Sequence, residues 1–454
     1  MIVNRSRLPE AGPARPFSFP TIHKSTLSNG LRVWTVRRSE VPVIAMMLLI
    51  RRGSAGDPPG KEGLAAMTAD MLDEGSGGRS AIEIHEALAR IGAQFDTDIG
   101  ADATLVSLTT LSRAADRGLA LLADIVARPS LTEADFARVR QLRLHRLTQL
   151  RDSPSAVAER TFVKLLYGSH PYGHTPVGHE QALASMSVDD VRNFHASAIR
   201  PSVSTLVAVG DCEHGDIERM AAEAFASWDG VSGADATDRD APAAAPARLN
   251  VVSRPGAPQS ELRIGHIAAA RHTPDYHALV VGNMVLGGQF VSRLNLNLRE
   301  QKGFTYGVRT VFDFRRMPGP FAVQVSVQTK TTAEAIAESI EEIAAIRGPR
   351  PITNDELAMG VAALTRGYAR NFETAEQVAR AVMQLALYDL PDNYFAEFVP
   401  RIDRVTAEEA TQVMARHTDP GRLSVLIVGD LQAVAPDLGA LQMGDPVILS
   451  ADTF

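Results

Sequence analysis

Ser204–Asp211, STLVAVGD, is a short apolar stretch that ends in Gly-Asp, and a close copy of it, LSVLIVGD, ends at Asp430. A continuous apolar run of this length predicts a strand buried in the core. The two copies lie 219 residues apart, and a second pair of similar stretches, Leu131–Phe136 and Ile352–Leu357, lies 221 residues apart. Because two independent anchors agree within two residues, we predict an internal duplication with halves of about 220 residues.

Each half mixes hairpin strands with helices of ten or more residues. Strands often follow directly on strands, which favours an α+β fold with largely antiparallel sheets covered by helices. A small, acidic, Pro/Ala-rich stretch with almost no apolar side chains separates the halves and is typical of a linker. We therefore expect an extended arm at 1–20, a first domain at 21–228, a linker at 229–247 and a second domain at 248–454.

Local patterns predict individual elements within these halves. Asn29-Gly30, between two alternating runs, is a strong hairpin signal, and Val43–Ile50 is a continuous apolar strand. Amphipathic spacing with cap and stop residues predicts helices in the first half and a strand followed by a helix in the second. These elements are expected at 61–74, 80–92, 114–127 and 132–150, and at 321–330 and 332–346.

Composition and charge exclude several classes of function. The 454-residue chain has a net charge of −7 and a pI near 6.0, which argues against nucleic-acid binding. Cys212 is the single cysteine, so neither an internal disulfide nor a cysteine metal cluster is available. No signal-peptide pattern opens the chain, and no run approaches the roughly 20 apolar residues of a membrane helix. We expect a soluble, cytoplasmic protein without a transmembrane segment.

Leu286–Gly307, LGGQFVSRLNLNLREQKGFTYG, combines a glycine pair with polar groups at a helix end. Phe290, Leu294 and Leu298 recur at a spacing of four, which predicts one apolar stripe of a helix. Gly303 is expected to end that helix in a left-handed turn. Arg299 and Tyr306 then flank the turn, so a guanidinium and a phenol can face the same space, although such residues are usually surface anchors.

The order Gly-Gly, Ser-Arg-Leu, Leu-Arg-Glu and Gly-Phe-Thr-Tyr-Gly in this stretch resembles the second-domain signature of the pitrilysin-type peptidases. These form the M16 family, whose zinc motif is inverted. The resemblance extends from about Ile22 to about Leu438 and implies two α/β-sandwich domains that face one another like a clamshell. It places the family's Arg-x6-Tyr pair, which binds substrate backbone beside a zinc ion, on Arg299 and Tyr306.

The zinc-binding residues that the resemblance implies are missing from this chain. In the family a Gly-Leu-Ala lead-in precedes His-x-x-Glu-His on a helix of the first domain. Here the lead-in is present as 63–65, and the three chemical positions are Ala66, Ala69 and Asp70. A catalytic zinc site needs three protein ligands and a water molecule. Asp70 alone cannot provide this set, so we expect no metal in this chain.

The family's third zinc ligand is a Glu on the helix expected at 132–150, shortly before an Asp-x-Pro. The Asp-x-Pro occurs at 152–154, yet no Asp or Glu lies between Arg138 and Arg151. Arginines recur through this stretch instead, and either they form a solvated helix face or some of them line a cavity that attracts acidic groups. They are Arg138, Arg140, Arg143, Arg146 and Arg151.

Histidines offer little support for another metal site. His85-Glu86 lies on a helix without a second histidine four residues away. His170, His174 and His179 are clustered, but the prolines and glycine among them argue against the helix that would align them. The stretch also resembles a packing loop of M16 chains.

The resemblance and the missing ligands together indicate a non-catalytic subunit of a heterodimeric M16 peptidase. A partner with an intact His-x-x-Glu-His motif would hold the zinc, and this chain would close the chamber and bind peptide substrates through Arg299 and Tyr306. Hydrolysis is not expected from this chain alone.

Two alternatives remain open at this point. The chain could be a scaffold of a larger complex with no role in proteolysis, as some M16-like chains are. It could also be an independent enzyme that uses Asp70, Asp73, Glu74 or the histidines at 170–179.

Overall fold

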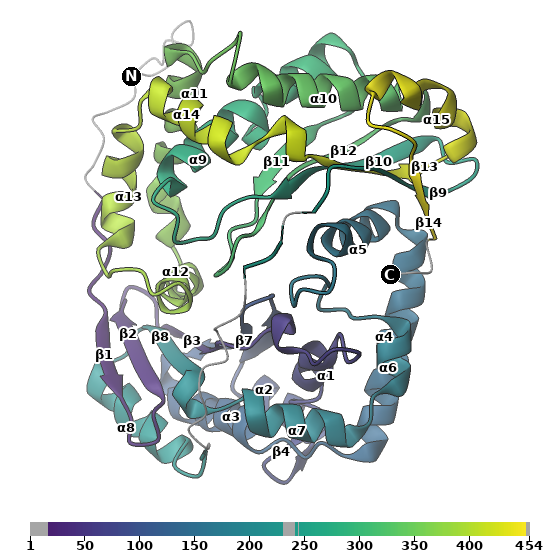
Figure 1. Ribbon diagram of the computed structural model, residues 1–454. Helices are drawn as coiled ribbons and strands as arrows, with labels where there is room; N and C mark the ends of the chain where they lie inside the picture. The colour runs from purple at the N-terminus through teal and green to yellow at the C-terminus, as the bar shows by residue number, and fades with distance from the viewer. Residues whose placement is uncertain (1–16, 230–240, 244, 451–454) are drawn as a thin grey trace, which may run out of the picture.

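Each half of the chain builds one six-stranded sheet in the computed structural model, which describes residues 17–229, 241–243 and 245–450 (Figure 1). The first sheet has the order β1-β2-β8-β3-β7-β6 and the second the order β11-β12-β10-β13-β9-β14. The first contains β1 (His23–Thr26), β2 (Arg32–Arg37), β3 (Val43–Ile50), β6 (Gln94–Ile99), β7 (Thr104–Leu111) and β8 (Ser204–Gly210). The second contains β9 (Leu249–Ser253), β10 (Gln259–Ile267), β11 (Val308–Phe312), β12 (Pro320–Gln328), β13 (Ser424–Gly429) and β14 (Val447–Leu449). A small hairpin, β4 (Gly75–Ser76) with β5 (Arg79–Ser80), stands apart.

The two sheets confirm the duplication. The repeated stretches form β8 and β13, and each lies between a parallel neighbour (β2 or β9) and an antiparallel one (β3 or β10). The antiparallel run then continues through β7 and β6 in the first half and through β12 and β11 in the second. Most pairings are antiparallel, as predicted.

Helices cover both faces of the sheets, which confirms the predicted α+β class. In the first half these are α1 (Leu64–Asp70), α2 (Ala81–Arg90), α3 (Ala115–Ala127), α4 (Glu133–Asp152), α5 (Pro154–Tyr167), α6 (Glu180–Ser185), α7 (Val188–Ala198) and α8 (His214–Ala224). In the second they are α9 (Tyr276–Asn283), α10 (Thr332–Ile346), α11 (Asn354–Thr365), α12 (Ala375–Leu387), α13 (Tyr394–Asp403), α14 (Ala407–His417) and α15 (Leu431–Leu438). None of the helices in the described ranges is both long and apolar enough to cross a membrane.

Strand β3 shows why the predicted apolar run needs cover on both sides. Side chains alternate across a strand, so even-numbered and odd-numbered residues point to opposite faces. Ile44 and Met46 pack into a core with α2, α3 and α8 of their own half. Ala45 and Met47 pack against α12, which comes from the second half. All of the strand after Val43 is therefore buried, as its continuous apolar run predicts.

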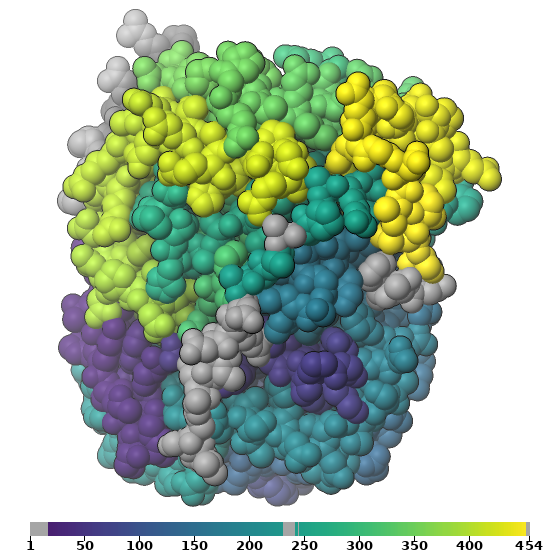
Figure 2. Space-filling model, in the orientation of Figure 1, coloured from purple at the N-terminus to yellow at the C-terminus, as the bar shows by residue number. Residues whose placement is uncertain are grey.

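The two halves exchange one helix each. Helix α12 packs on β3 and β8 of the first sheet, while α5 packs on β10 and β13 of the second. Their first residues, Pro154 and Ala375, are 221 positions apart, so the helices are counterparts in the duplication. Figures 1 and 2 show the two halves stacked in contact, and Figure 1 shows α12 and α5 at opposite ends of the contact region. Each half thus covers the apolar sheet face of the other.

The proposed arm and linker lie partly outside the described residues, namely at 1–16 and at 230–240 with 244. Where the chain is described, Phe17 stacks on Phe372 with ring centroids 4.9 Å apart, and Phe19 lies 5.0 Å from Phe395. The end of the proposed arm therefore packs on the second half. Trp228, just before the proposed linker, is buried in the core of the first half.

Candidate functional site

The segment 284–307 is a broken pair of π-helical turns, and the prediction of one helix carrying Phe290 is wrong. The turns are η4 (Met284–Gly288) and η5 (Asn295–Gln301). Leu294 and Leu298 are fully buried, as predicted, but Phe290 is 62% exposed. Gln289, with extended backbone angles, ends the first turn and takes Phe290 out of the helical repeat. Gly303 has a φ of +64°, which confirms the predicted left-handed end.

Close packing against β11 explains the first glycine of the pair, and close packing against Asn283 and Met284 explains the second. A Cβ atom on Gly287 would lie 2.6 Å from the side chain of Thr310, so only glycine fits there. Asn295 makes a second connection, because its Nδ2 donates to the Val308 carbonyl oxygen (2.8 Å) and its Oδ1 accepts from the Val308 N–H (3.1 Å). Asn295 therefore holds the helix that carries Arg299 against the strand that follows Tyr306. Sequence reasoning missed it.

Arg293 has a structural role in the same segment. Its guanidinium forms a fork with the carboxylate of Glu356 on α11, at 2.6 and 2.7 Å, and also donates to the carbonyl oxygens of Arg350 and Pro351. The hydrogen bonds from Arg293 and Thr353 lower the pKa of Glu356 to about 2, although burial, the largest single influence, acts in the opposite direction. Arg293, in the Ser-Arg-Leu part of the motif, thus anchors the segment to α11 and to the residues just before it.

Arg299 and Tyr306 differ in how firmly they are held. The Arg299 Cζ lies 3.9 Å from the centroid of the Phe290 ring, and its Nη1 lies 3.1 Å from Glu300 Oε1. Tyr306 is 95% exposed, and its hydroxyl has no hydrogen-bond partner among the described residues. A cavity of about 520 Å³ beside the segment is lined by Gly288, Phe290 and others, but neither Arg299 nor Tyr306 lines it. The exposed Tyr306 hydroxyl can therefore donate a hydrogen bond to another molecule.

The helix with the degenerate motif, α1, is fixed at its start by a buried carboxylate. Asp57 accepts hydrogen bonds from the N–H groups of Gly63 and Ala65, both at 2.7 Å, which satisfies donors at the helix N-terminus. His174 Nε2 lies 3.0 Å from the same carboxylate and 3.0 Å from the Ser54 carbonyl oxygen. His174 is therefore engaged in holding α1. Asp57 was not identified from the sequence.

The residues at the three chemical positions do not fit a zinc ion. Ala66 and Ala69 are buried and have no donor atoms. Asp70 forms an ion pair with Arg143 of α4, whose Nη2 also donates to the Pro176 carbonyl oxygen at 3.0 Å. A guanidinium at the only carboxylate repels a second cation. In the described part of the chain, no three His, Cys, Asp or Glu side chains are grouped closely enough to hold a metal ion.

The other acids considered for catalysis also have basic side chains as neighbours. Glu74 forms an ion pair with Arg138, and Asp73 Oδ2 lies 3.4 Å from His85 Nε2. Burial raises the pKa of Asp73. Asp73 and Glu74, which follow α1, thus each have a basic side chain as a neighbour, which is consistent with a structural role.

The arginines of α4 fit neither of the two interpretations completely. Three of the five form ion pairs with carboxylates of the first half, since Arg151 pairs with Glu180 in addition to the two pairs above. Arg140 donates to the Met186 carbonyl oxygen at 3.2 Å, and Arg146 is exposed. Arg151 also lines a cleft of the first half, so a solvated face describes only part of this run.

The histidine stretch 170–179 is a loop without helical turns, as its prolines predict. His170 Nδ1 accepts a hydrogen bond from the Tyr172 N–H at 3.0 Å. The Tyr172 hydroxyl donates to Asp102, whose other oxygen accepts from the Arg316 N–H at 2.9 Å. This chain of contacts joins the loop to both halves, which supports a packing role.

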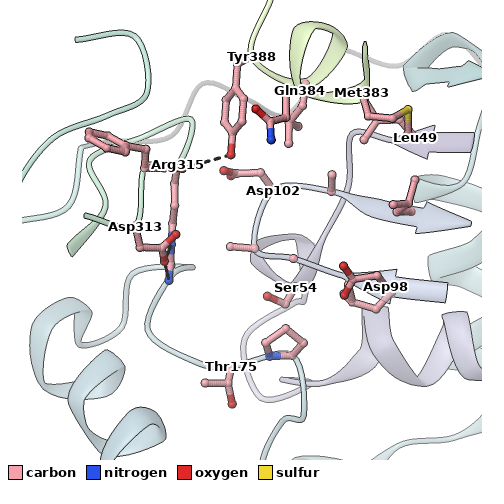
Figure 3. A pocket seen from close by; sticks show the side chains of 18 of the residues that line it. Leu49, Ser54, Asp98, Asp102, Thr175, Asp313, Arg315, Met383, Gln384 and Tyr388 are labelled. Carbon is pink, nitrogen blue, oxygen red and sulfur yellow. Dashed lines mark hydrogen bonds and ion pairs between the residues drawn. The ribbon is translucent and has the colours of Figure 1, made fainter. Parts of the chain in front are cut away.

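A cavity of about 610 Å³ lies between the two halves (Figure 3). The first half lines it with the β6–β7 turn and the loop around Thr175, and the second half lines it with 313–315 and α12. Figure 3 shows the Tyr388 hydroxyl pointing toward the Asp102 carboxylate, while this hydroxyl donates to the Phe314 carbonyl oxygen (3.2 Å). Burial raises the pKa of Tyr388 to about 12. The lining comes from separate segments of both halves, among them β3, the β6–β7 turn, α5, the loop around Thr175, 313–315 and α12, so no local pattern could predict it.

Comparisons with known proteins agree with this architecture. Residues 32–178 match the model of the insulinase family, peptidase family M16, and residues 185–364 match the model described as the peptidase M16 inactive domain. A protein of Mycobacterium tuberculosis named as an uncharacterized zinc protease is 23% identical over 427 residues, covering 93% of this chain and 96% of the relative. A Bacillus subtilis protein, also named as an uncharacterized zinc protease, is 25% identical over 339 residues, covering 74% of this chain and 81% of that protein.

Solved structures share the fold over most of their length. The crystal structure of a peptidase M16 inactive domain from Pseudomonas fluorescens has a TM-score of 0.84 and 25% identity, and the match covers 90% of this chain and 98% of that one. A protease from Helicobacter pylori has a TM-score of 0.83 at 20% identity, covering 90% and 99% of the two chains, which shows the fold alone. With two family models matched in succession and the paired sheets in place, this chain belongs to peptidase family M16.

Proposed function

We propose that this chain is the non-catalytic, peptide-binding subunit of an M16 metallopeptidase whose zinc and general base belong to a separate chain. The observation that carries the proposal is the contrast between the two halves. In the first, Arg143 occupies the carboxylate of Asp70 beside two alanines. In the second, Arg299 and Tyr306 stand on a segment that Asn295 fixes to β11.

The first half cannot supply the reacting groups of a zinc peptidase. Zinc hydrolysis requires an activated water molecule and a general base within reach of the scissile carbonyl. Ala66 and Ala69 offer neither, and the ion pair with Arg143 occupies Asp70. The proposal therefore assigns the cleavage chemistry to the partner, an M16 chain with an intact His-x-x-Glu-His helix.

The second half offers donors suited to a polypeptide. Tyr306 has one O–H, and the planar guanidinium of Arg299 can donate two parallel hydrogen bonds to carbonyl or carboxylate oxygens. The surrounding surface is apolar, since Phe290, Val291 and Leu296 are 62%, 45% and 42% exposed. Exposed apolar side chains that gather in one segment are typical of a surface that contacts another protein. A peptide held between the subunits would contact both the hydrogen-bond donors and the exposed apolar side chains.

The test is a peptidase assay with each chain alone and with both chains mixed, on a fluorogenic peptide. We expect no hydrolysis by this chain alone and hydrolysis by the mixture. Tyr306→Phe removes one donor and should lower kcat/KM of the mixture by about 10²–10³ if that donor acts on the developing oxyanion. Arg299→Ala should lower it as well. Arg219→Ala, which removes an exposed arginine of the outer helix α8, is the matched control and should leave the rate unchanged.

Two results would contradict the proposal. Equal rates for wild type, Tyr306→Phe and Arg299→Ala in the mixture would remove the peptide-binding role and leave a scaffold role. Stoichiometric zinc in the pure chain, or hydrolysis by it alone, would make it an enzyme in its own right.

A further inference from the structure

Outside the sites described above, the first half contains a cleft of about 780 Å³ between α4, α5 and the loop that leads into α6. Basic side chains from three elements line it. Arg151 comes from α4, Arg160 and Lys164 from α5, and His179 from the loop. Glu62 and Glu180 also line the cleft. None of these residues takes part in the proposed peptide binding.

Arg160 is a buried cation without an anionic partner. Its residue is 9% exposed. The described residues provide one hydrogen bond, from Nη2 to the Gly178 carbonyl oxygen (3.1 Å), and no carboxylate within ion-pair distance. Burial lowers the pKa of the guanidinium, and the nearby charge of Arg151 lowers it further. A buried charge left unmatched is strongly unfavourable, so an anion in this cleft would relieve a real cost.

The other basic side chains of the cleft differ in whether a carboxylate matches their charge. Arg151 has its charge matched by Glu180, but Lys164 has no carboxylate partner among the described residues. The Nδ1 of His179 is enclosed and makes no hydrogen bond to any described residue. Burial lowers the pKa of His179, and among its charged neighbours Arg160 and Lys164 lower it while Glu62 raises it. Arg160 and Lys164, two cations without a carboxylate partner among the described residues, therefore line one space, whereas the enclosed Nδ1 of His179 does not face it.

We propose that this cleft binds a small phosphate-type oxyanion, held by Arg160 and Lys164. The remaining N–H donors of the Arg160 guanidinium and those of the Lys164 ammonium suit a ligand with three or more oxygens. Two cations without a carboxylate partner suit a charge near −2. A carboxylate has two oxygens and a single charge, so it would leave one cation unmatched. The ligand is therefore a phosphate group, either free or as part of a small phosphorylated molecule.

The test is calorimetric titration of the full chain with inorganic phosphate. Saturable binding is expected with a Kd at or below about 1 mM. Arg160→Met keeps the volume of the buried stem, and Lys164→Met changes a partly exposed site. Both should weaken binding by at least about tenfold, the loss of one charge-assisted hydrogen bond. Arg146→Ala, an exposed arginine of α4 outside the cleft, is the control and should bind phosphate as wild type does.

The outcomes separate the possibilities. Absence of saturable binding up to about 10 mM phosphate would overturn the proposal, as would equal affinity in wild type and both Met variants. Competition by acetate as strong as that by unlabelled phosphate would overturn the assignment to phosphate. A phosphate-dependent rise in Tm that wild type and Arg146→Ala show and Lys164→Met lacks would support it independently, because a ligand that binds only the folded state stabilises it.

Discussion

Because α12 packs on the sheet of the first half, a destabilising substitution in this helix should also lower the stability of the first half. Leu385 belongs to the second half, is fully buried, and packs in the core that includes Trp34, Met47 and Val207 of the first sheet. Leu385→Ala removes three carbon atoms, worth about 2.4 kcal/mol of transfer free energy at roughly 0.8 kcal/mol each. The cavity left behind adds to this, so the expected loss of unfolding free energy is about 2–5 kcal/mol.

The assay is amide hydrogen exchange, which reports stability element by element without assuming a single unfolding step. Leu385→Ala should speed exchange in α12 and also in β3 and β8, although these strands lie more than 170 residues away in the sequence. Arg380→Ala, on an exposed position of the same helix, should change stability by less than about 0.5 kcal/mol. If faster exchange stayed confined to the second half, the inference that exchanged helices couple the halves would be wrong.

Three further predictions follow from particular contacts. Asp57→Ala should destabilise the first half by about 2–4 kcal/mol in denaturant titrations, because it removes acceptors from two N–H groups and from buried His174, whereas Asp57→Asn should cost less. Asn295→Ala should lower kcat/KM of the mixed peptidase and raise exchange at 303–308 while α10 keeps its protection. The low folded-state pKa of Glu356 means that its stabilisation is fully present above the unfolded value near 4.3 and is lost as the pH falls towards about 2. Arg293→Met should flatten the stability–pH curve in that window, and an unchanged curve would refute this.

Much of the fold follows from local patterns. The hairpin predicted at Asn29-Gly30 forms between the antiparallel strands β1 and β2, and Gly30 adopts a φ of +90°. The helix expected at 332–346 has those bounds. The helix expected at 80–92 begins at the N-cap Ser80, whose side chain accepts a hydrogen bond from the Glu83 N–H. These features depend on neighbours within a few residues, which is why sequence reasoning recovers them.

The candidate site was predicted less completely. Arg299, Tyr306 and the three degenerate positions were identified through family resemblance, and their roles stay proposals. Phe290 was placed on the wrong face because its spacing of four ignored the break that follows the glycine pair. The pair of Asp70 with Arg143 joins residues 73 positions apart, and nothing in the local sequence specifies such a partner.

The sequence by itself determined the duplication, the strand and helix pattern and the absence of zinc-ligand side chains at 66 and 69, because these depend on residue type and short-range periodicity. Only the tertiary structure decided which helix covers which sheet, which carboxylate Arg143 meets and where Arg160 lacks one. An apolar face must be covered, and a buried charge must be matched. The local sequence does not specify which residues do this, because the partners come together only through long-range packing.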